Sequence, residues 1–441
     1  MHKVWGHLSA LDLGAGIAKG KINPVELAEY FLSQIDAHPL GAQIYARTTP
    51  ARARGEAVAA AARAKSGLRR GALDGVPLSW KDNFDTAGTA TEGGSQLLRN
   101  RVPNADAKVL QNASLGGLIC LGKTQMSELA FSGLGLNPMT ATPPCINDAG
   151  AVAGGSSSGA ATSVAFGLAP AAVGSDTGGS VRLPAAWNDL VGFKPAHGTL
   201  PMGGVLPLCA RFDTVGPIAR NVADCAAVWA ALAGYRAPDL DNTTLAGARL
   251  AVLETVALDD LRDAPAKGFD DALARLSRAG ASITRLQFPQ AARAMALAGF
   301  VFNPEAYGLW KGVIEAAPEK MFPPILERFR LGASIFAADY VAAWQELEAI
   351  RHVWRAAVAG YDAIVLPTSP ILPPNTARLM SDTDYFVTEN LLALRNTRIG
   401  NLMGGAAITL PTAQPSVGIS LMAQGGGRLL RLAHAAEKAL R

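Results

Sequence analysis

The chain has 441 residues, of which 49% are hydrophobic, and its 40 Lys plus Arg against 36 Asp plus Glu give a formal net charge of +4. This small excess is spread along the sequence and forms no basic stripe, so no nucleic acid partner is expected. The longest apolar stretches, such as residues 160–173, contain Thr, Ser, Gly and Pro and are shorter than a membrane span. Neither a transmembrane helix nor a membrane partner is therefore expected.

The amino terminus and the cysteines indicate the compartment and the available chemistry. Residues 1–7 lead into polar sequence without an apolar core of signal-peptide length, which predicts a cytoplasmic protein. The cysteines show neither CxxC pairing nor histidines at zinc-site spacing, so we expect buried free thiols at Cys120, Cys145, Cys209 and Cys225. No metal site and no cofactor are expected.

The first clear helix is predicted to begin at Asn23. Asn23 can cap the helix, Pro24 suits its first position, and Glu26 can reach back three residues to the cap. Apolar residues then recur on one face at positions 27, 30, 31 and 35.

Residues 75–124 alternate short apolar runs with helical patterns. The run at residues 118–122 is an example of a predicted strand. Strands joined by crossover helices indicate an α/β sheet.

Two glycine-rich loops follow, each containing a serine. The first spans residues 154–159 and contains Ser156, and a helix rich in small residues is predicted at 160–167. A strand predicted at 170–175 leads into the second loop, residues 174–182, which contains Ser180. Both serines therefore lie at the ends of elements, where glycines permit unusual backbone angles.

A lysine upstream of both loops supplies a candidate base. A serine hydroxyl attacks an amide only when a base removes its proton. Lysine, with a reference pKa of about 10.4, must lose roughly three pKa units, or about 4 kcal/mol, to accept that proton at neutral pH. Lys81 has apolar neighbours in the sequence, Leu78, Trp80 and Phe84, that are suited to desolvate it.

Each of these motifs also has a simpler interpretation. Lys81 precedes Asp82, so it is alternatively a salt-bridged structural residue. The Gly-Gly-Ser stretch is alternatively a capping or phosphate-binding loop, although no Gly-Lys-Ser or Gly-Lys-Thr follows it, which disfavours a P-loop.

Residues from about 240 to 360 have a different pattern, dominated by helical periodicity such as that of residues 336–348. A break is predicted at residues 322–324, and a strand at 407–410 and a helix from 428 complete the chain. Aromatic residues of this helical layer either line a substrate pocket or pack in the core: Tyr307, Trp310, Phe329, Phe336 and Tyr340. No repeat or linker divides the chain.

Together these motifs resemble the amidase signature family of serine hydrolases. The similarity includes residues 76–83 around Lys81, both serine loops, residues 213–220 and residues 362–368, and so covers nearly the whole chain. It implies one α/β domain over residues 1–441, with a central mixed, twisted β-sheet flanked by helices on both faces. Residues of about 65–220 would form the signature core, and those of about 240–360 a helical layer that shapes the substrate pocket.

The resemblance also implies catalytic roles. Ser180 corresponds to the nucleophile, Lys81 to the base, and Ser156 to a bridging serine held by a cis peptide bond with Gly155. The backbone N–H groups expected to form the oxyanion hole belong to Thr177, Gly178, Gly179 and Ser180.

The same resemblance suggests substrate-binding residues. Residues 131–138 match a family loop near the acyl site, which makes Ser132 and Gly133 candidates. Arg182 either grips a substrate carboxylate or ties loops together beneath the site, and we favour the structural role. Asp176 is expected to order the second serine loop.

The predicted function is that of an amidohydrolase that cleaves the C–N bond of a small carboxamide through an acyl-serine and releases ammonia or an amine. The alternative is an ammonia-generating, glutaminase-type subunit of an amidotransferase complex. Departures from the family pattern disfavour this alternative, and they occur at Asn188, Asp189, Ala196 and Thr199. The expected partner is the small amide substrate, and a homodimer is the usual oligomer for such an enzyme.

Overall fold

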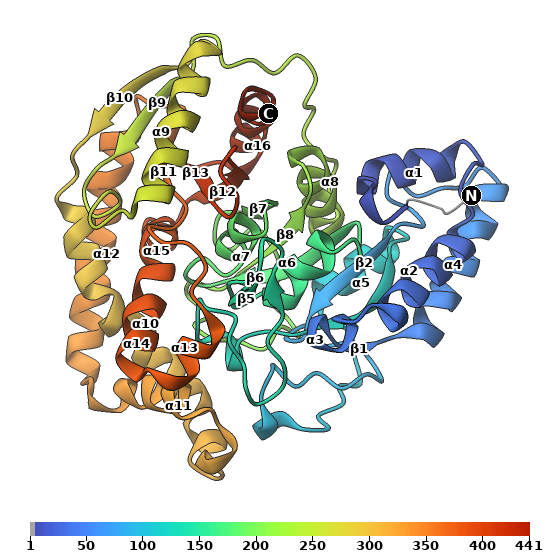
Figure 1. The fold of residues 1–441 in the computed structure, drawn as a ribbon, viewed down its shortest axis with the longest axis horizontal. Helices are drawn as coiled ribbons and strands as arrows, with labels where there is room; N and C mark the ends of the chain where they lie inside the picture. Colours follow the sequence, from blue (N-terminus) through green and yellow to red (C-terminus); the bar gives the residue numbers. More distant parts are fainter. Residues whose placement is uncertain (1–4) are drawn as a thin grey trace.

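Eleven strands form one mixed sheet through the middle of the molecule in the computed structural model, which describes residues 5–441 (Figure 1). The strands lie in the order β1-β3-β2-β6-β8-β7-β12-β13-β11-β9-β10, and β4 and β5 form a separate small sheet. The pairs β2/β3, β2/β6, β11/β9 and β9/β10 are parallel, whereas the pairs between β6 and β11 are antiparallel. The expected mixed α/β sheet is confirmed.

The strands have the following bounds: β1 Tyr45–Thr48, β2 Pro77–Lys81, β3 Ile119–Thr124, β4 Pro144–Cys145, β5 Asp148–Val152, β6 Ala171–Asp176, β7 Val191–Lys194, β8 Thr214–Ala219, β9 Arg249–Leu253, β10 Ser282–Leu286, β11 Ala363–Pro367, β12 Ala406–Pro411 and β13 Gly418–Ala423. The helices are α1 Ala10–Ala18, α2 Pro24–Ala37, α3 Gly41–Ile44, α4 Pro50–Lys65, α5 Lys108–Leu115, α6 Ser158–Ala165, α7 Arg182–Trp187, α8 Val222–Ala233, α9 Asp263–Arg278, α10 Gln290–Ile314, α11 Pro323–Arg330, α12 Ala337–Val358, α13 Thr376–Ser381, α14 Thr383–Ala393, α15 Arg395–Leu402 and α16 Gly426–Leu440.

Helices cover both faces of the sheet, as the side chains of β11 illustrate. Val365 belongs to the core shared with α8, α9 and α16, while its neighbours Ile364 and Leu366 belong to the core shared with α10, α12 and α15. This alternation follows from the period of two in a strand. Both faces of the central strands are therefore apolar, and the expected helical layers on both sides are confirmed.

Local sequence signals account for several element boundaries. The Asn23 side chain accepts a hydrogen bond from the N–H of Val25, and Pro24 occupies the first turn of α2, as predicted. The predicted strands at 118–122, 170–175 and 407–410 correspond to β3, β6 and β12. The helix α1 and the strand β13 were not predicted.

The region of residues 240–360 differs from the all-helical pattern predicted for it. It contains β9 and β10, which pair in parallel with β11 and form one edge of the main sheet. The prediction failed there because the long helices α10 and α12 dominate the periodicity of the region.

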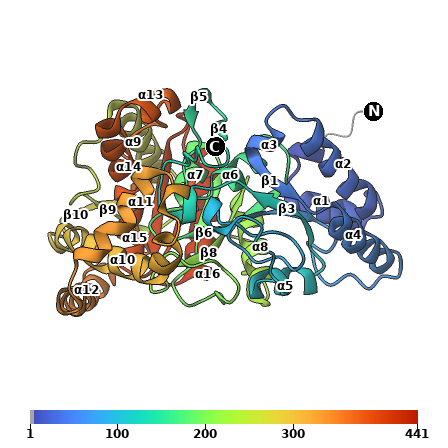
Figure 2. The same ribbon diagram turned by 90° about the horizontal axis from the view of Figure 1, so that it is seen from below.

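Helices α10, α11, α12, α14 and α15 gather at one end of the molecule, opposite the amino-terminal helices α1, α2 and α4 (Figures 1 and 2). Within residues 5–441 no helix is both long and apolar enough to cross a membrane. All four cysteines are buried and free, as expected.

Candidate active site

Lys81 is the last residue of β2, and the sheet and its helices bury its side chain completely. Its ammonium nitrogen Nζ lies 2.7 Å from Ser156 Oγ and 2.8 Å from Ser175 Oγ. A third, longer contact of 3.4 Å joins Nζ to the carbonyl oxygen of Ser175. The structure thus brings together the lysine and the first of the two serines that the sequence singled out.

Burial changes the protonation of this lysine. It lowers the pKa of Lys81 from 10.5 to about 7, although the charges of Asp176 and Asp213 act in the opposite direction. Removing a charged ammonium from water disfavours the charged form, and no carboxylate of residues 5–441 pairs with Nζ directly. Near neutral pH a large fraction of Lys81 is therefore an uncharged amine that can accept a proton.

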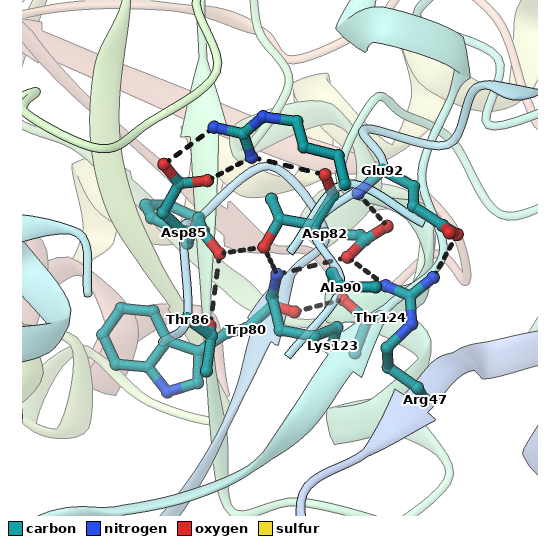
Figure 3. A network of polar contacts seen from close by, with 12 residues as sticks. Arg47, Trp80, Asp82, Asp85, Thr86, Ala90, Glu92, Lys123 and Thr124 are labelled. Carbon is teal, nitrogen blue, oxygen red and sulfur yellow. Dashed lines mark hydrogen bonds and ion pairs between the residues drawn. The ribbon is translucent and has the colours of Figure 1, made fainter. Parts of the chain in front are cut away.

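Asp82 does not neutralise Lys81, because it belongs to a separate ion cluster. Its Oδ1 lies 2.6 Å from Arg47 Nη1 and 3.2 Å from Lys123 Nζ (Figure 3). Arg47 also pairs with Glu92, which lies beside Asp82 in the same cluster (Figure 3). The salt-bridged interpretation of Lys81 is therefore wrong for this structure.

The two serine loops lie against each other. The peptide bond between Gly155 and Ser156 is cis, as the resemblance implied. The N–H of Ser157 donates to the carbonyl of Ser180 at 3.3 Å, so the residue that follows one serine contacts the other. Ser156 is fully buried, whereas the Ser180 hydroxyl makes no hydrogen bond with any residue of 5–441 and lines a cavity.

A buried ion pair supports the second loop from beneath. Arg182 Nε and Nη2 each lie 3.0 Å from an oxygen of Asp176, and both side chains are fully buried. Arg182 also donates to the Thr397 carbonyl and to Asn401 Oδ1. Burial raises the pKa of Asp176, but Arg182 outweighs this effect and brings it to about 2. Arg182 has the structural role, and its assignment as a substrate-binding residue is corrected because it does not reach the cavity.

Asp176 also fixes the backbone of this loop. Its Oδ1 accepts a hydrogen bond from the N–H of Gly179 at 2.9 Å, so that N–H points beneath the loop. The N–H groups of Gly178 and Ser180 have no hydrogen-bond partner among the described residues, and both residues line the cavity. Thr177 lines it as well, and its hydroxyl donates to Asp213 Oδ1 at 2.5 Å.

The cavity beside Ser180 has a volume of about 350 Å³. The serine loop forms its floor, and helices α10, α11, α14 and α15 supply most of its walls. Ser132 lies in the lining, as expected, and donates to Asn390 Oδ1 at 3.0 Å. Gly133 lies behind it, where its N–H donates to the same oxygen, so its assignment to the substrate surface is corrected.

The aromatic residues of the cavity wall are not those that the sequence indicated. The aromatic wall consists of Phe131, Phe302 and Phe386. The predicted set, Tyr307, Trp310, Phe329, Phe336 and Tyr340, lies outside the lining. Helical periodicity identified helices correctly but not which of their faces borders the cavity.

Sequence reasoning missed three other polar features of the site. Ser175 was quoted within the second loop, but only the structure shows its hydroxyl beside Lys81. The cavity also contains Arg328 and Arg398, which lie in no recognisable motif. No group of three or more His, Cys, Asp or Glu side chains suited to a metal ion occurs within residues 5–441.

Comparison with known proteins gives consistent similarities. Residues 26–427 match the family model described as Amidase. A glutamyl-tRNA(Gln) amidotransferase subunit from Anaeromyxobacter dehalogenans is 40% identical over 239 residues, which are 54% of this chain and 48% of that protein. The chain thus spans about half the length of the first curated relatives that it matches. A 2-amino-5-chloromuconic acid deaminase of Comamonas testosteroni is 29% identical over 94% of this chain and 92% of its own length.

A solved structure extends the similarity to the fold. The peptide amidase of Stenotrophomonas maltophilia superposes with a TM-score of 0.82 at 26% identity, covering 99% of this chain and 98% of that protein. The family match therefore covers residues 26–427, and the fold similarity covers 99% of the chain.

Proposed function

Since this chain belongs to the amidase family, whose members hydrolyse amides, we propose that it is a stand-alone amidohydrolase acting on a small carboxamide through an acyl-Ser180 intermediate. One observation carries the proposal. The fully buried Lys81, whose pKa burial lowers to about 7, lies 2.7 Å from Ser156 Oγ, and the loop of Ser156 contacts Ser180 at the floor of a cavity.

In the proposed reaction the three side chains form a proton relay. The neutral amine of Lys81 directs its N–H groups at the Ser175 hydroxyl and carbonyl, which leaves its lone pair for the Ser156 proton. Ser156 in turn takes the proton of Ser180, whose hydroxyl rotates onto it when substrate fills the cavity. Ser180 Oγ then bonds to the carbonyl carbon of the amide.

The relay then runs in reverse. Lys81, now an ammonium, returns a proton through Ser156 to the amide nitrogen, the C–N bond breaks, and ammonia or an amine leaves. A water molecule attacks the acyl-Ser180 ester by the same relay and releases the carboxylic acid. No step requires a cofactor.

The developing oxyanion needs hydrogen-bond donors that have no other partner. We propose the N–H groups of Gly178 and Ser180, together with that of Thr177. The N–H of Gly179 is not included because Asp176 accepts its hydrogen bond.

The experiment is ammonia release from a panel of aliphatic and aromatic amides, with labelling by a fluorophosphonate probe. Wild type should hydrolyse at least one amide and become labelled, while Ser180→Ala should do neither. Ser79→Ala is a matched control, because Ser79 is a buried serine whose hydroxyl lies 2.7 Å from that of Ser163 and which is outside the cavity lining. Labelling of Ser180→Ala at the wild-type rate would contradict the proposal.

The second candidate is the ammonia-generating component of an amidotransferase. The 40% identity with a glutamyl-tRNA(Gln) amidotransferase subunit favours it, although that match covers about half of the relative. Under this alternative the purified chain has almost no activity on simple amides and gains activity when its partner protein is added. Turnover by the chain alone at an ordinary enzymatic rate would exclude it.

A further inference from the structure

Two arginines in the wall of the cavity have no hydrogen-bond or ion-pair partner among residues 5–441. Arg328 of α11 and Arg398 of α15 both line the space above Ser180. Neither guanidinium makes a hydrogen bond or an ion pair with any residue of 5–441, and Arg328 Nη1 is completely buried without a partner. Buried guanidinium groups are normally paired, because an unpaired charge in a desolvated position costs free energy.

Both arginines lie close to the reacting end of the cavity. A Cβ atom placed on Gly178 would lie 3.9 Å from Arg398 Nε, so this side chain lies against the serine loop. The Arg328 guanidinium carbon lies over the Phe131 ring, 4.6 Å from its centroid, and Phe131 and the adjacent Ser132 both line the cavity. Any small molecule bound at Ser180 is within reach of one or both.

The electrostatics of the cavity favour an anion. Burial lowers the pKa of Arg328 to about 9, to which the charge of Arg398 also contributes, and burial lowers that of Arg398 to about 10. Both remain cationic at neutral pH and repel each other. Among the described residues the lining contains one carboxylate, Glu327, which is exposed and makes no hydrogen bond or ion pair with either arginine. The cavity therefore retains net positive charge.

We propose that Arg328 and Arg398 form an anion subsite, and that the substrate is a small amide that carries a carboxylate. This inference rests on the proposed amidohydrolase function and specifies its substrate class. Guanidinium groups bind carboxylates in bidentate fashion, and the bound anion would satisfy the donors that the protein leaves unpaired. The apolar part of the wall would contact the carbon chain between the carboxylate and the amide.

The test compares three small amides by kcat/KM: succinamate, with the carboxylate on the acyl side, N-acetylglycine, with it on the amine side, and neutral butyramide. One of the two acids should exceed butyramide by at least about tenfold, since a charge-assisted hydrogen bond contributes that much. The preferred acid identifies the side on which the carboxylate lies.

Arg328→Gln and Arg398→Gln should each reduce the ratio of acid to butyramide by about tenfold or more. Arg395→Gln is the matched control, because Arg395 lies on the same helix as Arg398 but outside the cavity lining, and it should keep the ratio. Arg398→Gln should not lower the melting temperature, since it removes a repulsive charge without removing a hydrogen bond or an ion pair within residues 5–441. Arg328→Gln relieves the same repulsion but also loses the contact of the guanidinium with the Phe131 ring, so the melting temperature is compared for Arg398→Gln. If a Gln variant fails to fold, the corresponding Lys variant, which keeps the charge but loses the bidentate contact, replaces it.

A binding measurement separates failure of this inference from failure of the proposed function. Succinate should raise the melting temperature of Ser180→Ala, and the Arg398→Gln change in that background should remove the shift. If the kcat/KM of butyramide equals that of both acids, or the ratio of acid to butyramide is unchanged in the Gln variants, the anion subsite is wrong, but the proposed amidohydrolase function is retained. If no amide is hydrolysed but succinate binds through the arginines, the subsite stands and the hydrolase does not. If succinate does not bind either, both are wrong.

Discussion

The loops at the end of the sheet and the helices above them differ in whether their buried polar side chains have hydrogen-bond partners within the protein. Beneath Ser180, Lys81, Asp176 and Arg182 are fully buried and each has several hydrogen-bond partners within the chain. Above it, the side chains of Arg328 and Arg398 have no hydrogen-bond partner among residues 5–441. A group that the protein already satisfies is preorganised for one geometry, whereas an unsatisfied group is available to a ligand. Substitutions below the cavity should therefore affect turnover and stability, and substitutions above it should affect substrate choice.

The largest effect is expected for Lys81→Met, which keeps the volume of the side chain and removes the base. We expect kcat to fall by at least about 10⁴-fold, as when a member of a catalytic unit is lost. In wild type, kcat/KM should rise with pH along an acid limb with an apparent pKa of about 7, because only the neutral amine accepts a proton. Steady-state rates between pH 5 and 10 measure both. An acid limb near pH 10 would contradict the assignment.

The same substitution also changes how stability depends on pH. The pKa of Lys81 is about 7 in the folded chain and 10.5 in a model environment, so between these values the unfolded chain binds more protons at this residue. Its contribution to the unfolding free energy therefore rises with pH by up to about 1.4 kcal/mol per pH unit. Lys81→Met should remove that slope, as measured by denaturant unfolding at pH 7, 8 and 9.

Lys194 offers a matched control for both measurements. It is also buried, burial lowers its pKa to about 7, and its Nζ donates hydrogen bonds to the backbone carbonyls of Pro195 and Gly405. Lys194→Met should change the stability slope and keep the kinetic acid limb. Loss of the acid limb in this variant instead would mean that Lys81 is not the group that limits the rate.

Ser156→Ala should have the next largest effect, a loss of about 10²–10⁴-fold in kcat, the range ascribed to one proton-transfer group. Ser156 has no role in substrate contact, because it is fully buried and outside the cavity lining. KM should therefore change little, and the circular dichroism spectrum should match that of wild type. A large rise in KM with an unchanged kcat would place Ser156 in binding and not in the relay.

Arg182→Gln tests stability below the cavity. Removal of the guanidinium leaves the Asp176 carboxylate buried without its main counter-charge, which should cost about 3–5 kcal/mol of unfolding free energy. The pKa of Asp176 is depressed to about 2, so the stability that it contributes is present above its model value of 3.8 and is lost as pH falls toward 2. The deficit of the variant should accordingly be full at pH 7 and shrink below pH 4. An equal deficit at pH 7 and pH 3 would mean that packing, not charge, explains it.

The same division between loops and helices separates what the sequence predicted from what it did not. Lys81 and Ser156 were paired from motifs, and the structure places their side chains in contact, because short glycine-rich loops at the ends of strands have few possible positions. The cavity wall was not predicted. Whether Trp310 or Phe302 of α10 faces the cavity depends on how the helix is rotated against the sheet, which periodicity does not determine. Arg398 lies in no recognisable sequence motif. It is identified as a candidate only because its guanidinium has no hydrogen-bond or ion-pair partner among residues 5–441.

Substitution of Asn390 should have the smallest effect on activity, and it tests the cavity wall separately from the proposed relay residues. Its Oδ1 accepts hydrogen bonds from Ser132 Oγ at 3.0 Å and from the Gly133 N–H at 3.1 Å, and it lies in the cavity lining. Asn390→Ala should release Ser132 and cost about 0.5–1.5 kcal/mol per lost bond. Because neither residue contacts Lys81 or Ser156, we expect KM to rise about three- to tenfold while kcat stays within about twofold of wild type. A fall in kcat comparable to that of Ser156→Ala would show that the wall also positions the relay, and the division between the two regions would not hold.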